Sequence, residues 1–276
     1  MMLAGFGGAG RVARALGVAF VRAGIPVAAV QSRDSRSAEV LADAVGAALS
    51  DDIGADAELV FLTVPDHAIA DCCAGIRWRA GCVAVHTSGA HGLDVLRAAP
   101  RAASFHPMQS FPEPSLAHDL ARGITISIEA EDAMIGTLTE MAERVGARAL
   151  RLPSGARPLY HASGYFASPL LVTMLDQAAA IWKAMGLDEK TALATLLPLL
   201  KETVRMIEDH GLERSLTGLV VRRDAGTLAA HMAELRRVAP DAARHYAYLT
   251  GVSIDMAVRT GRITAEEAAA LRAEIC

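Results

Sequence analysis

The sequence predicts an α/β protein, with a parallel-sheet domain over residues 1–153 followed by an all-helical domain over residues 154–276. A glycine run, Gly5 to Gly10, follows a short apolar start and precedes the amphipathic stretch 11–23. Strand-like and helix-like segments then alternate as far as Leu152, which is typical of a parallel sheet covered by helices on both faces. Beyond Pro153, long segments rich in alanine and leucine take over, and none of them is a convincing strand.

The glycine run reads Gly-Phe-Gly-Gly-Ala-Gly, a G-x-G-x-x-G pattern between a predicted strand and a predicted helix. In such a turn the glycines give a tight bend, let a pyrophosphate approach the backbone and let the helix pack closely on the strand. The predicted strand before the glycines is unusually short, residues 1–4. The run and the start of the helix supply the predicted dinucleotide contacts: Gly5, Phe6, Gly7, Gly8, Ala9, Gly10, Arg11 and Val12.

The end of the second predicted strand, residues 25–30, indicates which dinucleotide is bound. Ser32 and Arg33 stand where the ribose-reading residue is expected, and Arg36 follows one helical turn later. A hydroxyl with guanidinium groups suits a 2′-phosphate, so this segment favours NADP(H) over NAD(H). Asp34 would favour NAD(H) if it reached the ribose, but it is better placed to cap the next helix.

Further strands are predicted at residues 59–64, 82–85, 102–105, 123–129 and 148–152, with a helix at 131–145. Polar side chains follow the first three of these strands, at the carboxyl edge where open α/β sheets bind ligands. The residues assigned to line the cofactor are Thr63, Val64, Pro65, His86 and Ser88, and those assigned to the substrate side are His106 and Gln109. Val-Pro-Asp is also an ordinary strand stop, and a structural histidine remains the alternative for position 86.

Helices are predicted at residues 157–185, 188–209, 225–238 and 241–259. Gly186 and Gly211 have the positions of helix stops, and Asp188 has that of a helix start. Thr264 and Glu267 match a capping box. The prolines inside these helices, Pro169 and Pro198, predict a kink or a break.

Two histidines are candidates for acid–base chemistry. Reduction of a carbonyl needs a proton donor with a pKa near the operating pH, and histidine is the side chain best suited. His161 lies early in the first predicted helix of the second domain, with Ser163 two positions on and Ser168 two turns on. His106 is held extended by Pro107. For either histidine, packing at a domain boundary is the competing interpretation.

Four strings taken together carry a family resemblance: His-Thr-Ser-Gly at 86–89, His-Pro-Met-Gln-Ser-Phe at 106–111, Tyr-His-Ala-Ser at 160–163 with Phe-Ala-Ser at 166–168, and Leu-Thr-Gly at 216–218. In this order they resemble the Rossmann-like oxidoreductases that carry the domain of unknown function 2520, relatives of pyrroline-5-carboxylate reductase. The resemblance implies a Rossmann-type domain, a C-terminal domain similar to the helical domain of 6-phosphogluconate dehydrogenase, a substrate site facing the nicotinamide and a homodimer formed through the helical domain. It also implies an NADP-dependent enzyme for a small carbonyl or imine substrate, some members being ketopantoate reductases.

The sequence departs from that family at three positions. Members usually carry Asn where Ser168 stands, Pro where Leu219 stands and Gly where Arg223 stands. A serine reaches less far than an asparagine amide, so substrate or rate should differ if position 168 is used. These departures keep open a nucleotide-binding sensor or scaffold without turnover, and the His-Pro-Met string keeps open a prephenate dehydrogenase-like enzyme.

Composition excludes several other classes. The net charge is −4 and no Lys/Arg block exceeds two residues, so nucleic acid is not an expected partner. The four cysteines lack C-x-x-C spacing and the histidines lack H-x-x-x-H spacing, so neither a disulfide framework nor a metal site is expected. No window approaches the roughly 18 apolar residues of a membrane span, and a soluble cytoplasmic enzyme with a small-molecule substrate fits best.

Overall fold

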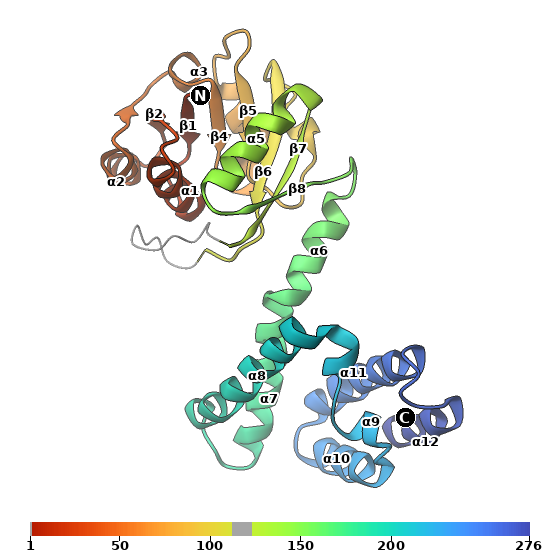
Figure 1. The fold of residues 1–276 in the computed structure, drawn as a ribbon. Helices are drawn as coiled ribbons and strands as arrows, with labels where there is room; N and C mark the ends of the chain where they lie inside the picture. Colours follow the sequence, from red (N-terminus) through yellow and green to blue (C-terminus); the bar gives the residue numbers. More distant parts are fainter. Residues whose placement is uncertain (1, 112–122) are drawn as a thin grey trace. The chain divides into compact units, whose positions relative to one another are not determined.

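The computed structural model describes residues 2–111 and 123–276 (Figure 1). By its contacts the chain divides into two compact units, Met1–Ser168 and Pro169–Cys276, called here the sheet unit and the helical unit. The last strand ends at Arg151, close to the boundary predicted at residues 153 and 154. Helix α6 (Arg157–Ala167) follows that strand and groups with the sheet unit.

The sheet unit contains one eight-stranded sheet with the order β3-β2-β1-β4-β5-β6-β7-β8. Its strands are β1 (Ala4–Gly7), β2 (Val27–Gln31), β3 (Ala48–Leu49), β4 (Leu59–Leu62), β5 (Val83–His86), β6 (Arg101–Pro107), β7 (Thr125–Ala130) and β8 (Arg148–Arg151). The predicted parallel sheet is confirmed, with one exception that the sequence did not indicate: β7 pairs antiparallel with β6. Strands β4, β5 and β6 are parallel neighbours, so the three polar segments that follow them meet at one edge, as predicted.

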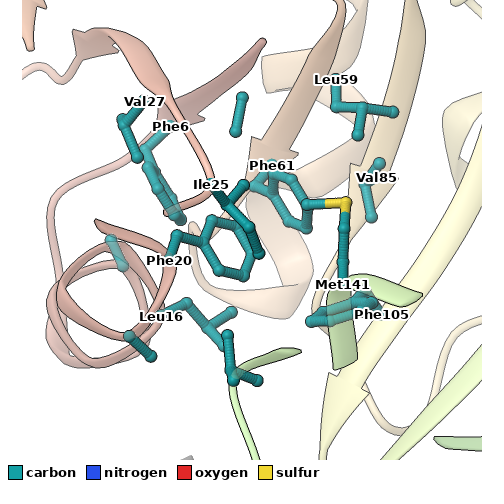
Figure 2. Close-up of a cluster of buried hydrophobic side chains, with 14 of the residues drawn as sticks. Phe6, Leu16, Phe20, Ile25, Val27, Leu59, Phe61, Val85, Phe105 and Met141 are labelled. Atoms are coloured by element: carbon teal, nitrogen blue, oxygen red, sulfur yellow. The ribbon is translucent and has the colours of Figure 1, made fainter. Parts of the chain in front are cut away.

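Helices cover both faces of the sheet, as the alternating pattern predicts. The helices of this unit before α6 are α1 (Arg11–Arg22), α2 (Ser35–Val45), α3 (Ile53–Asp56), α4 (Ile69–Gly75) and α5 (Asp132–Arg144), with the 3-10 helices η1 (Asp66–Ala68) and η2 (Leu93–Leu96). Side chains of α1, α2 and α5 share one apolar cluster with the sheet, and those of α3, α4 and η2 share another. Phe6, Phe20, Phe61 and Phe105 form the aromatic centre of the first cluster (Figure 2). Their rings contact edge-on or tilted, at centroid distances of 5.1–6.1 Å.

Strand β1 extends into the glycine run instead of stopping before it. Gly5 and Gly7 pair with residues of β2 and β4 on either side. A Cβ at Gly5 would lie 2.8 Å from the Ala57 Cβ, and one at Gly7 would lie 2.9 Å from Leu62 Cδ2. These two glycines are therefore required by packing, and the turn itself consists of residues 8–10.

The helical unit contains only helices among its secondary-structure elements, as predicted for residues beyond 153. They are α7 (Pro169–Ala184), α8 (Glu189–Ser215), α9 (Leu219–Arg222), α10 (Ala225–Val238), α11 (Pro240–Arg259) and α12 (Ala265–Ile275). Asp188 caps α8 and Thr264 forms a capping box with Glu267, both as predicted. The predicted break at Pro169 is confirmed, because α6 ends at Ala167 and α7 begins at Pro169. Helix α8 instead runs through Pro198 and is interrupted at Gly211 (φ 75°).

The helical unit has a small core of its own, but its first two helices contribute little to it. Leu228, Met232, Ile254 and Leu271 centre the core on α10, α11 and α12. Helix α7 has no buried residue, and α8 has one, Ala192. No helix in the described part of the chain is both long and apolar enough to cross a membrane.

Candidate active site

The turn after β1 has the features of a phosphate site. Gly8 adopts φ 115°, a conformation that L side chains rarely adopt, and a Cβ there would lie 3.0 Å from the Thr63 carbonyl oxygen. Thr63 fixes the turn from β4, because its Oγ1 donates to the Gly8 carbonyl (3.1 Å) and its N–H donates to the Gly7 carbonyl (2.9 Å). Helix α1 begins at Arg11, its N-cap Gly10 provides no side-chain cap, and its first turn holds no acidic residue. Its free N–H groups and positive dipole end therefore suit an anion.

The predicted contacts within the glycine run differ in what they can offer a ligand. Phe6 is fully buried in the aromatic centre of the core, so its side chain is not available to a cofactor. Gly10 is open, because the nearest heavy atom to a Cβ there would be 4.0 Å away. Arg11 is exposed, and its guanidinium lies 3.4 Å from the Phe111 carbonyl oxygen.

The segment after β2 places two exposed arginines, Arg33 and Arg36, around a capped helix end. Asp34 is the N-cap of α2, as predicted: its carboxylate accepts from the Ser37 N–H (3.3 Å) and from the Ser37 hydroxyl (2.6 Å). Hydrogen bonds from Ser37 lower the pKa of Asp34. The carboxylate is thus engaged by its own helix, while Ser32 and the two guanidinium groups are left at the strand tip.

The segment after β4 connects with the segment after β5. Val64 is half-buried and Pro65 is exposed, and Asp66 opens η1. Ser88 Oγ donates to the Asp66 carboxylate (2.8 Å), lies 3.1 Å from His91 Nδ1 and accepts from the backbone N–H of residues 90 and 91. The Ser88 hydroxyl therefore stabilises its own loop. The residue also lies at the predicted edge of the sheet.

Two histidines flank Gly89 at this edge. A Cβ at Gly89 would lie 2.7 Å from His106 Nε2 and 2.7 Å from His161 Cδ2, closer than real Cβ contacts allow. The two imidazole rings are 6.4 Å apart between centroids. His106 Nδ1 is 3.1 Å from the Tyr160 hydroxyl, whereas His161 is exposed. The structure thus brings together the two histidines that the sequence nominates as acid–base candidates.

Polar side chains on one face of β5, β6 and β7 lie against polar side chains of α6. We call them together the polar cluster: His86, Ser104, His106, Ser127 and Glu129 from the strands, and Arg157 and Tyr160 from α6. His86, Ser104 and Glu129 are paired neighbours across the three strands, and His106 and Ser127 form the next paired row. Paired residues, and residues two apart on a strand, share a face of the sheet.

Arg157 spans the polar cluster from the first turn of α6. It is 1% exposed; its Nε donates to Glu129 Oε2 (2.8 Å) and its Nη1 donates to the Ser88 carbonyl (3.1 Å). Its Nη2 has no hydrogen-bond partner among the described residues, and the same holds for His86 Nε2 and Ser104 Oγ. Buried polar atoms of this kind are commonly satisfied by ordered water.

The environment keeps both imidazoles, that of the buried His86 and that of the half-buried His106, neutral near pH 7. Burial, reinforced by the Arg157 cation, lowers the pKa of His86 to about 3 and that of His106 to about 4. Burial also raises the pKa of Tyr160. His86 Nδ1 accepts from the Ser88 N–H (3.2 Å), which leaves the ring proton on Nε2.

The remaining predicted residues lie around the end of β6 and along α6. The Ser168 hydroxyl is 3.0 Å from the Ser110 hydroxyl, which joins the end of α6 to the segment after β6. Gln109 is exposed and accepts from the Ser110 N–H (2.9 Å), and the exposed Ser163 donates to the Tyr160 carbonyl (2.6 Å). No group of three or more His, Cys, Asp or Glu residues within 2–111 and 123–276 is arranged to hold a metal ion.

Sequence reasoning missed Glu129 and Arg157 and gave Tyr160 no role. A signal was present, because Ser104, Ser127 and Glu129 are polar residues at alternate positions of segments otherwise composed like strands. Such positions normally face a core, so their polarity indicates a buried polar partner. The identity of that partner was not predictable, because Arg157 is 28 residues from Glu129 along the chain.

Two family profiles match successive parts of the chain. Residues 2–107 match the Rossmann-like domain, and residues 124–252 match the domain of unknown function DUF2520. The second match begins in the sheet unit, so it includes β7, α5, β8 and α6 as well as helices of the helical unit.

Similar solved structures extend over nearly all of the chain. A candidate NADP oxidoreductase from Bacteroides fragilis is 27% identical, with a TM-score of 0.73 over 92% of this chain and 98% of that chain. A protein from Thermotoga maritima is 24% identical, with a TM-score of 0.78 over 94% of this chain and 100% of that chain. A reductive aminase from Aspergillus terreus, solved with NADPH and ethyl levulinate, is 17% identical, with a TM-score of 0.63 over 98% of both chains.

No curated protein sequence matches the chain significantly. The two profile matches nevertheless occur in order along one chain, and the similar structures extend over both of its units. Together with the sheet order, they support the resemblance seen in the sequence: the chain matches a Rossmann-like domain over residues 2–107, followed by a DUF2520 domain over residues 124–252.

Proposed function

We propose that this protein is an NADP(H)-dependent oxidoreductase that transfers a hydride between nicotinamide and a small carbonyl or imine substrate. One observation carries the proposal: a glycine turn with free N–H groups that suit an anion, and a pair of histidines, lie at the same carboxyl edge of one sheet. The similar structures support the cofactor class, because one is a candidate NADP oxidoreductase and another was solved with NADPH.

The residues at this edge fit a dinucleotide. The backbone of Gly8 to Gly10 and the first turn of α1 would hold the pyrophosphate, since Gly8 and Gly10 carry no side chain that would block it and no carboxylate competes in the first turn of α1. Ser32, Arg33 and Arg36 would hold the 2′-phosphate. Thr63, Val64 and Pro65 would line the middle of the cofactor, and the segment from His86 to Ser88 would meet its nicotinamide half.

When bound, the nicotinamide supplies or accepts the hydride, and the protein orients the substrate and moves a proton. A neutral His106 whose Nδ1 accepts from Tyr160 carries its proton on Nε2, the nitrogen beside Gly89. We assign this N–H to the substrate oxygen or nitrogen, as a polarising hydrogen-bond donor. We assign acid–base work to the exposed His161, which exchanges protons with solvent, and substrate positioning to Gln109, Ser163 and Ser168.

Cofactor choice is tested by fluorescence titration of NADPH and NADH into the wild type and the double variant Arg33→Ala/Arg36→Ala. The wild type should prefer NADPH. The double variant should lose at least about tenfold in NADPH affinity, since hydrogen bonds to charged groups contribute about 1.5–3 kcal/mol each. NADH affinity should hardly change, and the matched control Arg22→Ala, an exposed arginine at the far end of α1, should bind like the wild type. Equal binding of both nucleotides by the wild type would contradict the assignment.

Turnover is tested by NADPH oxidation against a panel of cyclic imines and 2-oxo acids. The enzyme should consume NADPH with at least one substrate class, and His161→Ala should lower kcat by about 10²-fold or more, as expected for lost acid–base catalysis. Stoichiometric NADPH binding without oxidation across the panel would instead support a sensor without turnover. Full activity of His161→Ala would remove that residue from the mechanism.

We further propose that the protein is a homodimer formed through α7 and α8. Helix α7 is largely apolar but buries none of its 16 residues, and Val172 on it is 67% exposed. On α8, Leu199 is 64% exposed and Leu212 is 66% exposed. Helices that leave large apolar side chains exposed are expected to bury them against another chain, and a second copy would cover both helices by symmetry. Light scattering should give twice the 29.0 kDa chain mass, and Val172→Glu should give the single mass. A monomeric wild type would overturn this.

A further inference from the structure

The buried ion pair beneath α6 lies behind the residues assigned to chemistry. Arg157 is 1% exposed and Glu129 is 15% exposed, so both charges have been removed from most of their water. A buried ion pair is not an efficient way to attach a helix, because apolar residues of similar volume commonly hold as well or better. What an ion pair adds is direction: a guanidinium donates along fixed lines, so the helix that carries it can sit in only one orientation.

The register in which β5, β6 and β7 pair explains how the orientation of α6 is set. Glu129 and Ser104 are opposite one another on β7 and β6, and Ser104 in turn pairs with His86 on β5. Arg157 bonds to Glu129 at one end of this row and to the carbonyl of Ser88, just after β5, at the other. Its guanidinium is therefore fixed on both sides, across the width of three strands.

The second attachment of α6 lies three residues along the helix. Tyr160 is on the same helical face as Arg157, because residues three apart are neighbours on a helix surface. Its hydroxyl meets Nδ1 of His106, which is two residues beyond Ser104 on β6 and on the same sheet face. Arg157 and Tyr160 thus contact successive rows of the sheet, and together they fix both the position and the rotation of α6.

We propose that Arg157 is a positioning residue that, through Glu129 and the Ser88 carbonyl, holds α6 so that the Tyr160 hydroxyl fixes the orientation of the His106 ring. With Nδ1 engaged by Tyr160, Nε2 is the atom beside Gly89. A rotation of α6 would release the ring and lose this aim. The consequence for catalysis rests on the proposed function, but the geometry of the His106 ring can be measured without cofactor or substrate.

The charges around His106 act in the same direction. Arg157, Tyr160 and His161 face it from α6, Asp66 faces it from η1, and His86 lies beside it on β5. Burial and then the Arg157 cation hold the pKa of His106 at about 4, and the smaller effect of the Asp66 carboxylate opposes this. Arg157 therefore affects the ring in two separable ways, by its charge and by the helix position that it imposes.

The two effects are separated by nitrogen-15 NMR of the histidine rings. The shift difference at His106 Nδ1 between wild type and Tyr160→Phe defines the signature of the tyrosine bond. Arg157→Met should move the shift more than halfway to the Tyr160→Phe value and should raise the pKa of His106 from about 4 toward the ordinary 6.5. Arg157→Lys keeps the charge but cannot donate to both partners, so it should move the shift while the pKa stays low.

The control is Arg151→Met, which removes an exposed arginine paired with Asp132 in the same unit and should leave both readouts at wild-type values. If Arg157→Met does not fold, Glu129→Gln decides, because it keeps the guanidinium and weakens only its anchor; it should move the Nδ1 shift in the same direction. A folded Arg157→Met, or in its place a Glu129→Gln, with the wild-type Nδ1 shift would overturn the proposal. If the wild type does not turn over NADPH but the variants still give this NMR pattern, the result would count against the proposed function and not against the positioning role.

Discussion

The two halves of the sheet's carboxyl edge are built by different means. At β1 and β2 the features that suit a ligand are backbone groups and exposed arginines: the turn at Gly8, the open start of α1, and Arg33 with Arg36. At β5, β6 and β7 they are buried side chains that hold one another, with Arg157 and Glu129 at the centre. Substitutions of the exposed arginines or of the open Gly10 in the first half should therefore change binding with little effect on folding, whereas substitutions in the second half should change both.

Acidification should reveal the largest effect, and only in the buried half. His86 and His106 have pKa values of about 3 and about 4 in the folded chain, below the ordinary 6.5. At a pH between the folded pKa of each histidine and 6.5, that histidine is protonated in the unfolded chain but not in the folded chain. The free energy of unfolding should therefore fall as the pH drops below about 6.5, by about 1.4 kcal/mol per pH unit for each histidine, until the folded pKa is reached.

Urea unfolding at pH 7.5, 6 and 5 measures this slope. His106→Gln should remove about half of the dependence between pH 6.5 and 5, where carboxylates contribute little. The comparison variant is His67→Gln, at an exposed position in η1, and it should leave the slope as in the wild type. A wild-type stability that is flat over this range would show that the two imidazoles are not held neutral.

A pair of glycine substitutions compares the two halves directly. Gly89→Ala places a Cβ 2.7 Å from His106 Nε2 and from His161 Cδ2, and His106 is held by Tyr160. It should cost about 1–3 kcal/mol of stability, as overpacking usually does, and it should also reduce turnover. Gly10→Ala meets nothing closer than 4.0 Å, so it should unfold at the wild-type urea concentration.

The expected cost of Gly10→Ala lies in binding, because its methyl group would stand where a pyrophosphate approaches the backbone. Urea midpoints and NADPH titrations of both variants provide the test. The contrast fails if Gly89→Ala is as stable as the wild type, or if Gly10→Ala binds NADPH unchanged while being destabilised.

The same difference explains how much could be predicted. The turn, the cap at Asp34 and the capping box at Thr264 are local patterns of a few residues, and the structure confirms the turn and both caps. The reversal of β7 and the partnership of Glu129 with Arg157 depend on contacts between distant segments. Periodicity gives the period and face of a strand but not its direction, and spacing along the chain does not identify which distant charge a buried carboxylate meets.

The path of β1 shows the limit for local patterns as well. The glycine string predicts a turn, but Gly5 and Gly7 are strand residues, and they must be glycine because Ala57 and Leu62 approach them closely. A sequence motif indicates that small residues are needed at these positions, but the steric reason depends on neighbouring residues that only the structure identifies. The sequence likewise nominates His161 as an acid–base residue, but it does not predict that His161 lies beside Gly89.

At Arg223 an unfavourable backbone conformation is opposed by favourable side-chain contacts, and a substitution there should have the smallest effect. Among the described residues it is the only one other than glycine with positive φ (62°), at the end of α9, where the resembling family carries glycine. The left-handed conformation costs a residue with a Cβ about 1 kcal/mol or more. Against this, Arg223 Nε lies 2.6 Å from Glu267 and its Nη2 donates to the Arg262 carbonyl (3.2 Å).

Exposed ion pairs contribute about 0–1 kcal/mol, so relief of the backbone should slightly outweigh their loss. Arg223→Gly should therefore raise the free energy of unfolding by a few tenths of a kcal/mol, an increment that urea unfolding resolves as a small rise in midpoint. Arg223→Asn, which also tolerates this conformation but loses the ion pair, should lie between wild type and Arg223→Gly. If Arg223→Gly is instead less stable by about 1 kcal/mol, side-chain contacts prevail over backbone preference even at an exposed helix end.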